Sequence, residues 1–158
     1  MIARLIYLSI LLASALLVGL GMYYQYALHL QPCAPQVLVR YALVFAALFA
    51  LIAVAIDAGK AVRIGMSVCI GLVSVLGAVL AAYQSWPRYV PLNFAAIGVN
   101  LESTVRTFPL ADVLPRFFLS SGGCDGARWK IVGIAASEWS FFAFLVFIVA
   151  AFIAARRG

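Results

Sequence analysis

The apolar stretch VLVRYALVFAALFALIAVAI, from Val37 to Ile56, decides the fold of this chain. A helix of about 20 apolar residues is long enough to cross the roughly 30 Å hydrocarbon core of a bilayer. The stretch contains a single charged residue, Arg40, and the segment QPCAPQ precedes it, with Cys33 between two prolines. Seven residues make about two helical turns, so Cys33 and Arg40 fall on nearly one face of a helix. The sequence therefore predicts a membrane span with a thiol and a cation near one end.

Three further apolar segments flank this span, at residues 5–30, 64–84 and 139–155. The chain of 158 residues is 66% hydrophobic and 10% charged, and its mean hydropathy is +1.11. A soluble domain of this size has too little interior to bury so much apolar surface. The first segment is longer than the apolar run of a cleavable signal peptide, about 7–15 residues. We therefore expect an all-α membrane protein, a four-transmembrane-helix bundle that forms one membrane domain over residues 1–158.

The net charge of +6 is better explained by membrane topology than by nucleic-acid binding. The Lys and Arg residues form no basic stripe and are not interleaved with stacking aromatic residues. Cations flank the apolar segments on one side of the expected membrane, at Arg4, Lys60, Arg63, Arg156 and Arg157. Because cytoplasmic flanks are enriched in Lys and Arg, we expect both termini in the cytoplasm and a long loop, residues 85–137, outside.

The long outer loop contains a helical pattern of its own. Apolar residues recur at helical spacing along one face, at Leu110, Val113, Leu114, Phe117 and Phe118. Two interpretations of this pattern stay open. The segment is either a short interfacial helix on the membrane surface or an apolar cap that packs over the bundle.

The cysteines suggest redox chemistry rather than metal binding. Cys33 and Cys124 both fall on the expected outer side, where an oxidising bacterial envelope favours a disulfide. At a helix N-terminus the dipole would favour the Cys33 thiolate, whereas a static structural disulfide is the competing interpretation. Cys69 lies within the third span and is expected to be a small packing residue. With one histidine and no CxxC, the sequence predicts no metal site.

Arg40 is the clearer indication of a binding site. A charge within a span is costly and marks a functional site by default, although a long side chain can also extend to the interface. The directed N–H donors of a guanidinium suit an oxygen-bearing ligand such as a quinone carbonyl. A serine hydrolase is not predicted, because the chain has no GxSxG motif and its single histidine, His29, lies near no obvious acid.

Along nearly its whole length the chain resembles the disulfide bond formation protein B (DsbB) family. The matching segments are YxxxxxxxPC ending at Cys33, VLVRYAL at 37–43, VRTFP at 105–109, FFLSSGGC ending at Cys124, and WKIVGI before EWS at 138–140. The resemblance implies a four-helix inner-membrane oxidoreductase that reoxidises a periplasmic DsbA-type thiol oxidase. It further implies that the electrons pass to a membrane quinone, ubiquinone or menaquinone.

The resemblance also assigns roles to residues of this chain. Cys33 would work beside the quinone, Cys124 would lie in the loop that exchanges with DsbA, and Arg40 would help to hold the quinone. Each cysteine belongs to a pair in the family, but here Gln36 replaces the second cysteine of the first CxxC. The cysteine expected shortly before VRTFP is missing as well, and residues 101–104 read LEST there.

This departure leaves two interpretations. In the first, a single inter-loop disulfide, which the resemblance implies between Cys33 and Cys124, supports a shortened cycle. A DsbA thiolate would attack Cys124 and release Cys33 as the leaving thiolate, which Arg40 and the helix dipole would stabilise. In the second, the exchange chain is broken, and the protein is a catalytically weak or inactive membrane scaffold with a structural disulfide.

Overall fold

Four long helices dominate the computed structural model, which describes residues 2–27, 34–56, 59–85, 130–131 and 134–156. Each of the four is long and apolar enough to cross a membrane. They are α1 (Ile2–Ala27), α2 (Ala34–Ala55), α3 (Lys60–Ser85) and α7 (Ala136–Arg156). The predicted fold class, an all-α bundle of four transmembrane helices, is confirmed.

The helices begin before the apolar segments from which they were predicted. α2 starts at Ala34 rather than Val37, and α3 starts at Lys60 rather than Ile64. Hydropathy marks only the part of a helix inside the hydrocarbon core, whereas backbone hydrogen bonding continues into the interface. Pro35 fits the first turn of α2, because the N–H groups there have no partner within the helix.

A small hairpin precedes α7 and was not predicted from the sequence. Strands β1 (Lys130–Ile131) and β2 (Ile134–Ala135) pair antiparallel, with Lys130 opposite Ala135 and Ile131 opposite Ile134. The hairpin lies near the end of the expected outer loop. The surface helix or cap expected around 110–118 lies outside the described residues.

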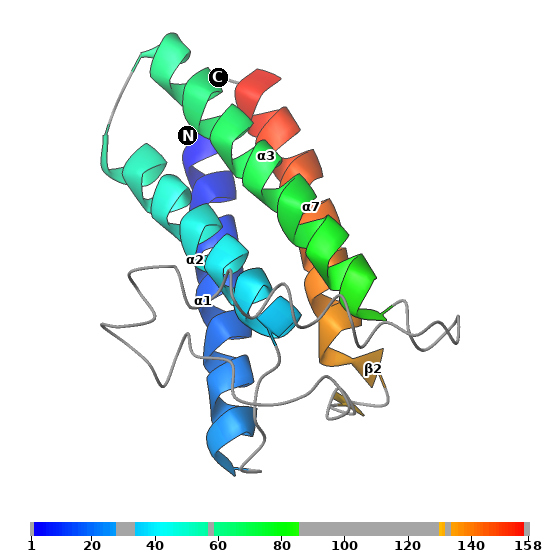
Figure 1. Cartoon of the computed structure of the whole chain (residues 1–158). Coiled ribbons are helices and arrows are strands. Elements are labelled where there is room, and N and C mark those ends of the chain that lie inside the picture. The colour runs from blue at the N-terminus through cyan, green and yellow to red at the C-terminus, as the bar shows by residue number, and fades with distance from the viewer. Residues whose placement is uncertain (1, 28–33, 57–58, 86–129, 132–133, 157–158) are drawn as a thin grey trace.

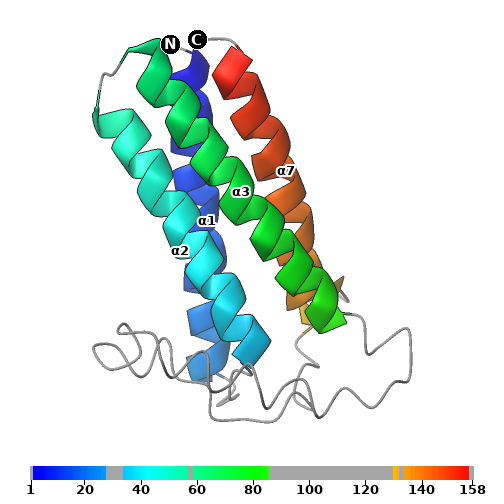
Figure 2. The same cartoon turned by 45° about the horizontal axis from the view of Figure 1, so that its top comes forward.

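The helices surround a common core in chain order, with α1 packed against α2 and α7, and α3 packed against α2 and α7 (Figure 1). The N- and C-terminal ends of the chain lie at the same end of the bundle (Figure 2). Large apolar side chains remain exposed on the outside of every helix, among them Leu12, Leu51, Leu76 and Val146. Such a surface suits a surrounding of lipid chains, which are as apolar as leucine.

Small residues bring the helices of the core into close contact. Ala42, Ala46 and Ala50 form a buried stripe along one face of α2. At Gly77 on α3, a methyl group would overlap the ring of Phe144 on α7, which is fully buried. Gly77 therefore allows the aromatic ring of one helix to lie directly against the backbone of its neighbour.

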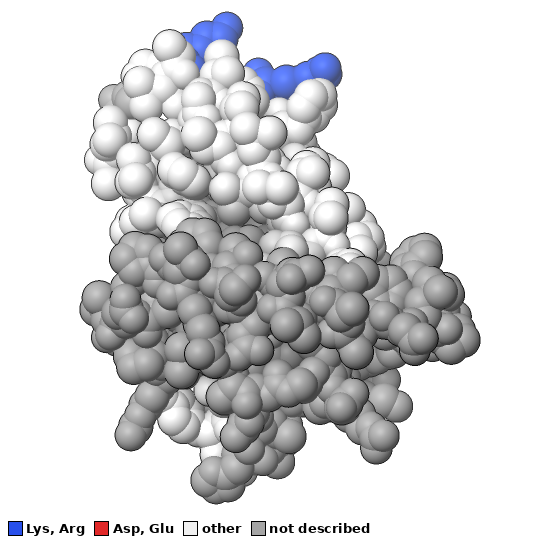
Figure 3. Space-filling view, in the orientation of Figure 1, with Lys and Arg blue, Asp and Glu red and all other residues white. Residues whose placement is uncertain are grey.

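The end of the bundle that holds both termini also carries cationic side chains (Figure 3). Arg4 donates a hydrogen bond of 3.2 Å to the carbonyl of Val54, and the Arg156 guanidinium lies 4.2 Å above the Phe152 ring. Nearby, the buried hydroxyls of Tyr7 and Ser67 are 2.8 Å apart and join α1 to α3. This end is thus held together by polar contacts and presents positive charge.

Candidate functional site

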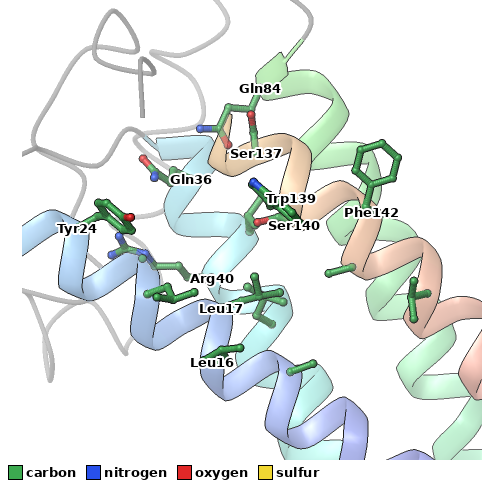
Figure 4. A pocket seen from close by; sticks show the side chains of 17 residues that line it. Leu16, Leu17, Tyr24, Gln36, Arg40, Gln84, Ser137, Trp139, Ser140 and Phe142 are labelled. Atoms are coloured by element: carbon green, nitrogen blue, oxygen red, sulfur yellow. The ribbon is translucent and has the colours of Figure 1, made fainter. Parts of the chain in front are cut away.

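Arg40 lies inside the bundle rather than on its lipid-facing surface. It occupies the second turn of α2, and only 5% of its surface is exposed, which excludes a side chain that extends outward to the interface. The side chain extends toward α1, where Tyr24 lies beside it (Figure 4). Opposite the guanidinium is Gly21 of α1, whose missing side chain leaves space: a Cβ there would lie 3.9 Å from Arg40 Nε. Arg40 is therefore buried between α2 and α1, and its role in ligand binding stays a prediction.

Beside Arg40 lies a cavity of about 620 Å³, formed by α1, α2 and α7 and by the last turn of α3. This volume is within the range of about 300–1,000 Å³ that is usual for small-molecule sites. The polar lining residues are Tyr24, Gln36, Arg40, Gln84, Ser137 and Ser140. The apolar lining includes Leu16, Leu17, Leu20, Leu43, Phe142 and Val146.

The polar and apolar lining residues are segregated along the cavity. The polar side chains gather toward the end of the bundle away from the chain termini, whereas Leu16 and Leu17 lie deeper along α1 (Figure 4). Leu16 and Val146 are each 63% exposed and line the cavity with part of their surface, so the apolar end opens onto the outside of the bundle. A molecule with a polar head and an apolar tail matches this arrangement.

The polar end of the cavity is fixed by a contact between α3 and α7. The Ser85 hydroxyl donates a hydrogen bond of 3.0 Å to the carbonyl of Ala81, one turn earlier on α3. Ser85 Oγ also lies 3.0 Å from Ser137 Oγ, within hydrogen-bond distance, and both residues are buried. Because Ser137 lines the cavity, this contact holds one of its walls in place.

Gln36 lines the same cavity one helical turn before Arg40. Its side chain is half-buried, and among the described residues none makes a hydrogen bond with its carboxamide. From the sequence, Gln36 was interpreted only as the loss of a cysteine. Its spacing of four residues from Arg40 was a signal that the two side chains share one face.

The other lining residues were also missed by sequence reasoning. Gln84, Ser137 and Ser140 come from segments that are distant in sequence from Arg40. The motif EWS, which contains Trp139 and Ser140, was the available signal for the α7 side of the site.

The two predicted redox cysteines, Cys33 and Cys124, lie outside the described residues. α2 begins at Ala34, the residue that follows Cys33 in the sequence. Cys69 is a free, half-buried thiol on α3 and does not line the cavity. Within the described part of the chain there is no cluster of His, Cys, Asp or Glu that could hold a metal ion.

The fold is that of a multi-pass membrane protein whose helices enclose a cavity that is polar at one end and apolar at the other. The chain belongs to the disulfide bond formation protein DsbB family, whose model matches residues 3–154. A disulfide bond formation protein B from Aromatoleum aromaticum is 34% identical over 157 residues, covering 98% of this chain and 95% of the relative. The protein of the same name from an Acidovorax species is 32% identical over 146 residues, covering 92% of this chain and 83% of the relative.

Family membership fixes the general activity. The protein is a disulfide bond formation protein, a disulfide oxidoreductase of the inner membrane. The resemblance seen in the sequence is thereby confirmed, and nearly the whole chain takes part in it.

Proposed function

We propose that this protein oxidises a periplasmic DsbA-type dithiol and passes the electrons to a membrane quinone held in the cavity beside Arg40. The observation that carries the proposal is the cavity itself, which places a buried guanidinium at the polar end of an otherwise largely apolar chamber. Quinones have this composition, with carbonyl oxygens on a ring and a long apolar tail. The cationic end of the bundle would face the cytoplasm, and the polar end of the cavity would lie near the periplasmic surface.

The lining residues have distinct tasks in this function. Arg40 donates N–H groups to a carbonyl oxygen, and such charge-assisted hydrogen bonds are about twice as strong as neutral ones. The leucines and Val146 surround the apolar tail, and together with Phe142 they exclude water from the polar contacts. Ser137, held by Ser85, supports the wall opposite α2.

The electron transfer starts at the disulfide that we infer between Cys33 and Cys124. A DsbA thiolate attacks Cys124 and forms a mixed disulfide, while Cys33, the residue before α2 in the sequence, leaves as a thiolate. The second DsbA thiolate then attacks the mixed disulfide, so that DsbA leaves oxidised and Cys124 is free. Cys33 and Cys124 take up the two protons that the DsbA thiols lose. They then return to the disulfide and give up two electrons and two protons, which a quinone held beside Arg40 would take up.

The test is quinone reduction by the purified protein in lipid nanodiscs under anaerobic conditions. Reduced DsbA from the same organism serves as the donor, and decylubiquinone and a short-chain menaquinone serve as acceptors. We expect the absorbance of at least one quinone to fall catalytically, with one DsbA disulfide formed per quinone reduced. If neither acceptor is reduced above the rate without the membrane protein, the proposed electron transfer from DsbA to a quinone is wrong.

A further inference from the structure

Gln36 stands where the family has a cysteine, and it lines the cavity beside Arg40. The loss of the cysteine does not explain why a glutamine lies there. Residues four apart on a helix lie next to each other, with their Cβ atoms about 5–6 Å apart. Gln36 and Arg40 therefore extend from adjacent positions of α2 into the same polar end of the cavity. Both side chains are long enough to reach a single ligand oxygen.

The two side chains offer different hydrogen-bonding groups. A guanidinium has five N–H donors and no acceptor, whereas a carboxamide has two donors and an acceptor oxygen. A quinone carbonyl only accepts hydrogen bonds, so Arg40 alone can satisfy it. Reduction turns this carbonyl into a hydroxyl, whose hydrogen needs an acceptor that Arg40 cannot provide.

Ser137, Ser140 and Gln84 are less well placed to accept that hydrogen. The phenol oxygen of Tyr24, which lies beside Arg40 (Figure 4), is a weaker acceptor than a carboxamide oxygen. The Ser137 hydroxyl is already within hydrogen-bond distance of Ser85. Gln84 comes from the end of α3 and lies beside Ser137, away from the Arg40 guanidinium (Figure 4). Gln36 is the carboxamide next to Arg40, and no described residue makes a hydrogen bond with it.

We infer that Gln36 is a specificity residue that accepts a hydrogen bond from the ligand hydroxyl and so favours the reduced, quinol form of the ligand bound beside Arg40. This inference rests on the proposed function, because it takes the ligand to be a quinone. Gln36 thus supplies a contact that a cysteine, with its weak acceptor sulfur, would provide poorly. It favours reduction of the bound quinone, since a ligand that is bound more tightly when reduced is more easily reduced.

The test compares the affinities of decylubiquinone and decylubiquinol for the whole protein in detergent, measured by anaerobic calorimetry. Gln36→Met keeps the length and volume of the side chain but removes its acceptor. We expect quinol binding to weaken about tenfold, because a buried hydroxyl hydrogen loses its partner. Quinone binding should weaken less than about twofold, because the Arg40 donors remain. Gln84→Met makes the same change at the same cavity and should leave the ratio of the two affinities unchanged.

The outcomes separate this inference from the function on which it rests. If the parent protein binds neither form, the proposed function fails and this inference fails with it. If the parent binds the quinone but Gln36→Met weakens both forms equally, or neither, the role of Gln36 is refuted and quinone binding stands. If Gln84→Met changes the ratio of the quinol and quinone affinities as much as Gln36→Met does, a specific role for Gln36 is also refuted.

Discussion

Replacing Arg40 with methionine is expected to weaken quinone binding by about 10- to 100-fold while the four-helix bundle stays folded. A hydrogen bond from a charged donor contributes about 1.5–3 kcal/mol, and each 1.4 kcal/mol changes an affinity tenfold. The fold should tolerate the change, because methionine is apolar and Arg40 is only 5% exposed. The dissociation constant of decylubiquinone, measured by calorimetry in detergent, checks the prediction.

Two further variants make this result specific to the guanidinium. Arg40→Lys keeps the charge but loses the planar group of donors, so its affinity should fall between those of the parent and Arg40→Met. Arg63→Met removes a cation from the opposite end of α3, near Tyr7 and away from the cavity, and should leave quinone binding unchanged. Unchanged affinity in Arg40→Met, or an equal loss in Arg63→Met, would show that Arg40 does not hold the quinone.

Replacing either Cys33 or Cys124 with alanine is expected to reduce turnover with reduced DsbA to the rate measured without the membrane protein. Each cysteine is half of the single disulfide that we propose as the redox centre, so neither can work without the other. Quinone binding should persist in both variants, because the lining residues that we expect to hold the quinone, Arg40 above all, are unchanged. Quinone absorbance under anaerobic conditions measures turnover, and calorimetry measures binding.

Cys69→Ala provides the matched control for the cysteine variants. Cys69 is a free thiol on α3 outside the cavity, so its removal should leave turnover within about twofold of the parent. Turnover that survives in Cys33→Ala or in Cys124→Ala would exclude the two-cysteine cycle. The electrons would then have to enter by another route.

The four helices could be predicted from the sequence because each is a long apolar run with few charges. Their exact ends could not be predicted, since α2 and α3 extend beyond their apolar segments. The hairpin of β1 and β2 was missed because strands of two residues have no recognisable alternation. Local composition therefore predicts the number and order of the spans, but not how the chain enters and leaves them.

The candidate site could be predicted in part. Arg40 stood out because a charge in a membrane span is costly, and its burial agrees with that expectation. The cavity could not be predicted, because it depends on how α1, α2 and α7 pack at one end of the bundle. The place of Gln36 in the cavity could not be predicted for the same reason: comparison with a family motif indicates which residue is lost, but not what its replacement contacts.

The loss of one cysteine from each of the family's two pairs does not by itself exclude activity. The cysteines would carry the thiol exchange, whereas the cavity is lined by residues of α1, α2 and α7 and the last turn of α3, with Gln36 standing at the position of one missing thiol. Quinone binding and thiol exchange can therefore be tested separately. Quinone binding depends on cavity residues that the structure describes, whereas thiol exchange depends on Cys33 and Cys124, which lie outside the described residues.

The most direct measurement is photolabelling of the protein in nanodiscs with an azido-quinone, followed by mass spectrometry of the modified peptides. We expect labels on the cavity-lining segments of α1, α2 and α7, around Leu17, Leu43 and Trp139. An excess of unlabelled quinone should suppress these labels, and Arg40→Met should weaken them. Labels that instead spread over the exposed face of α3, at Leu72 and Leu76, and do not respond to Arg40→Met would contradict a quinone site in this cavity.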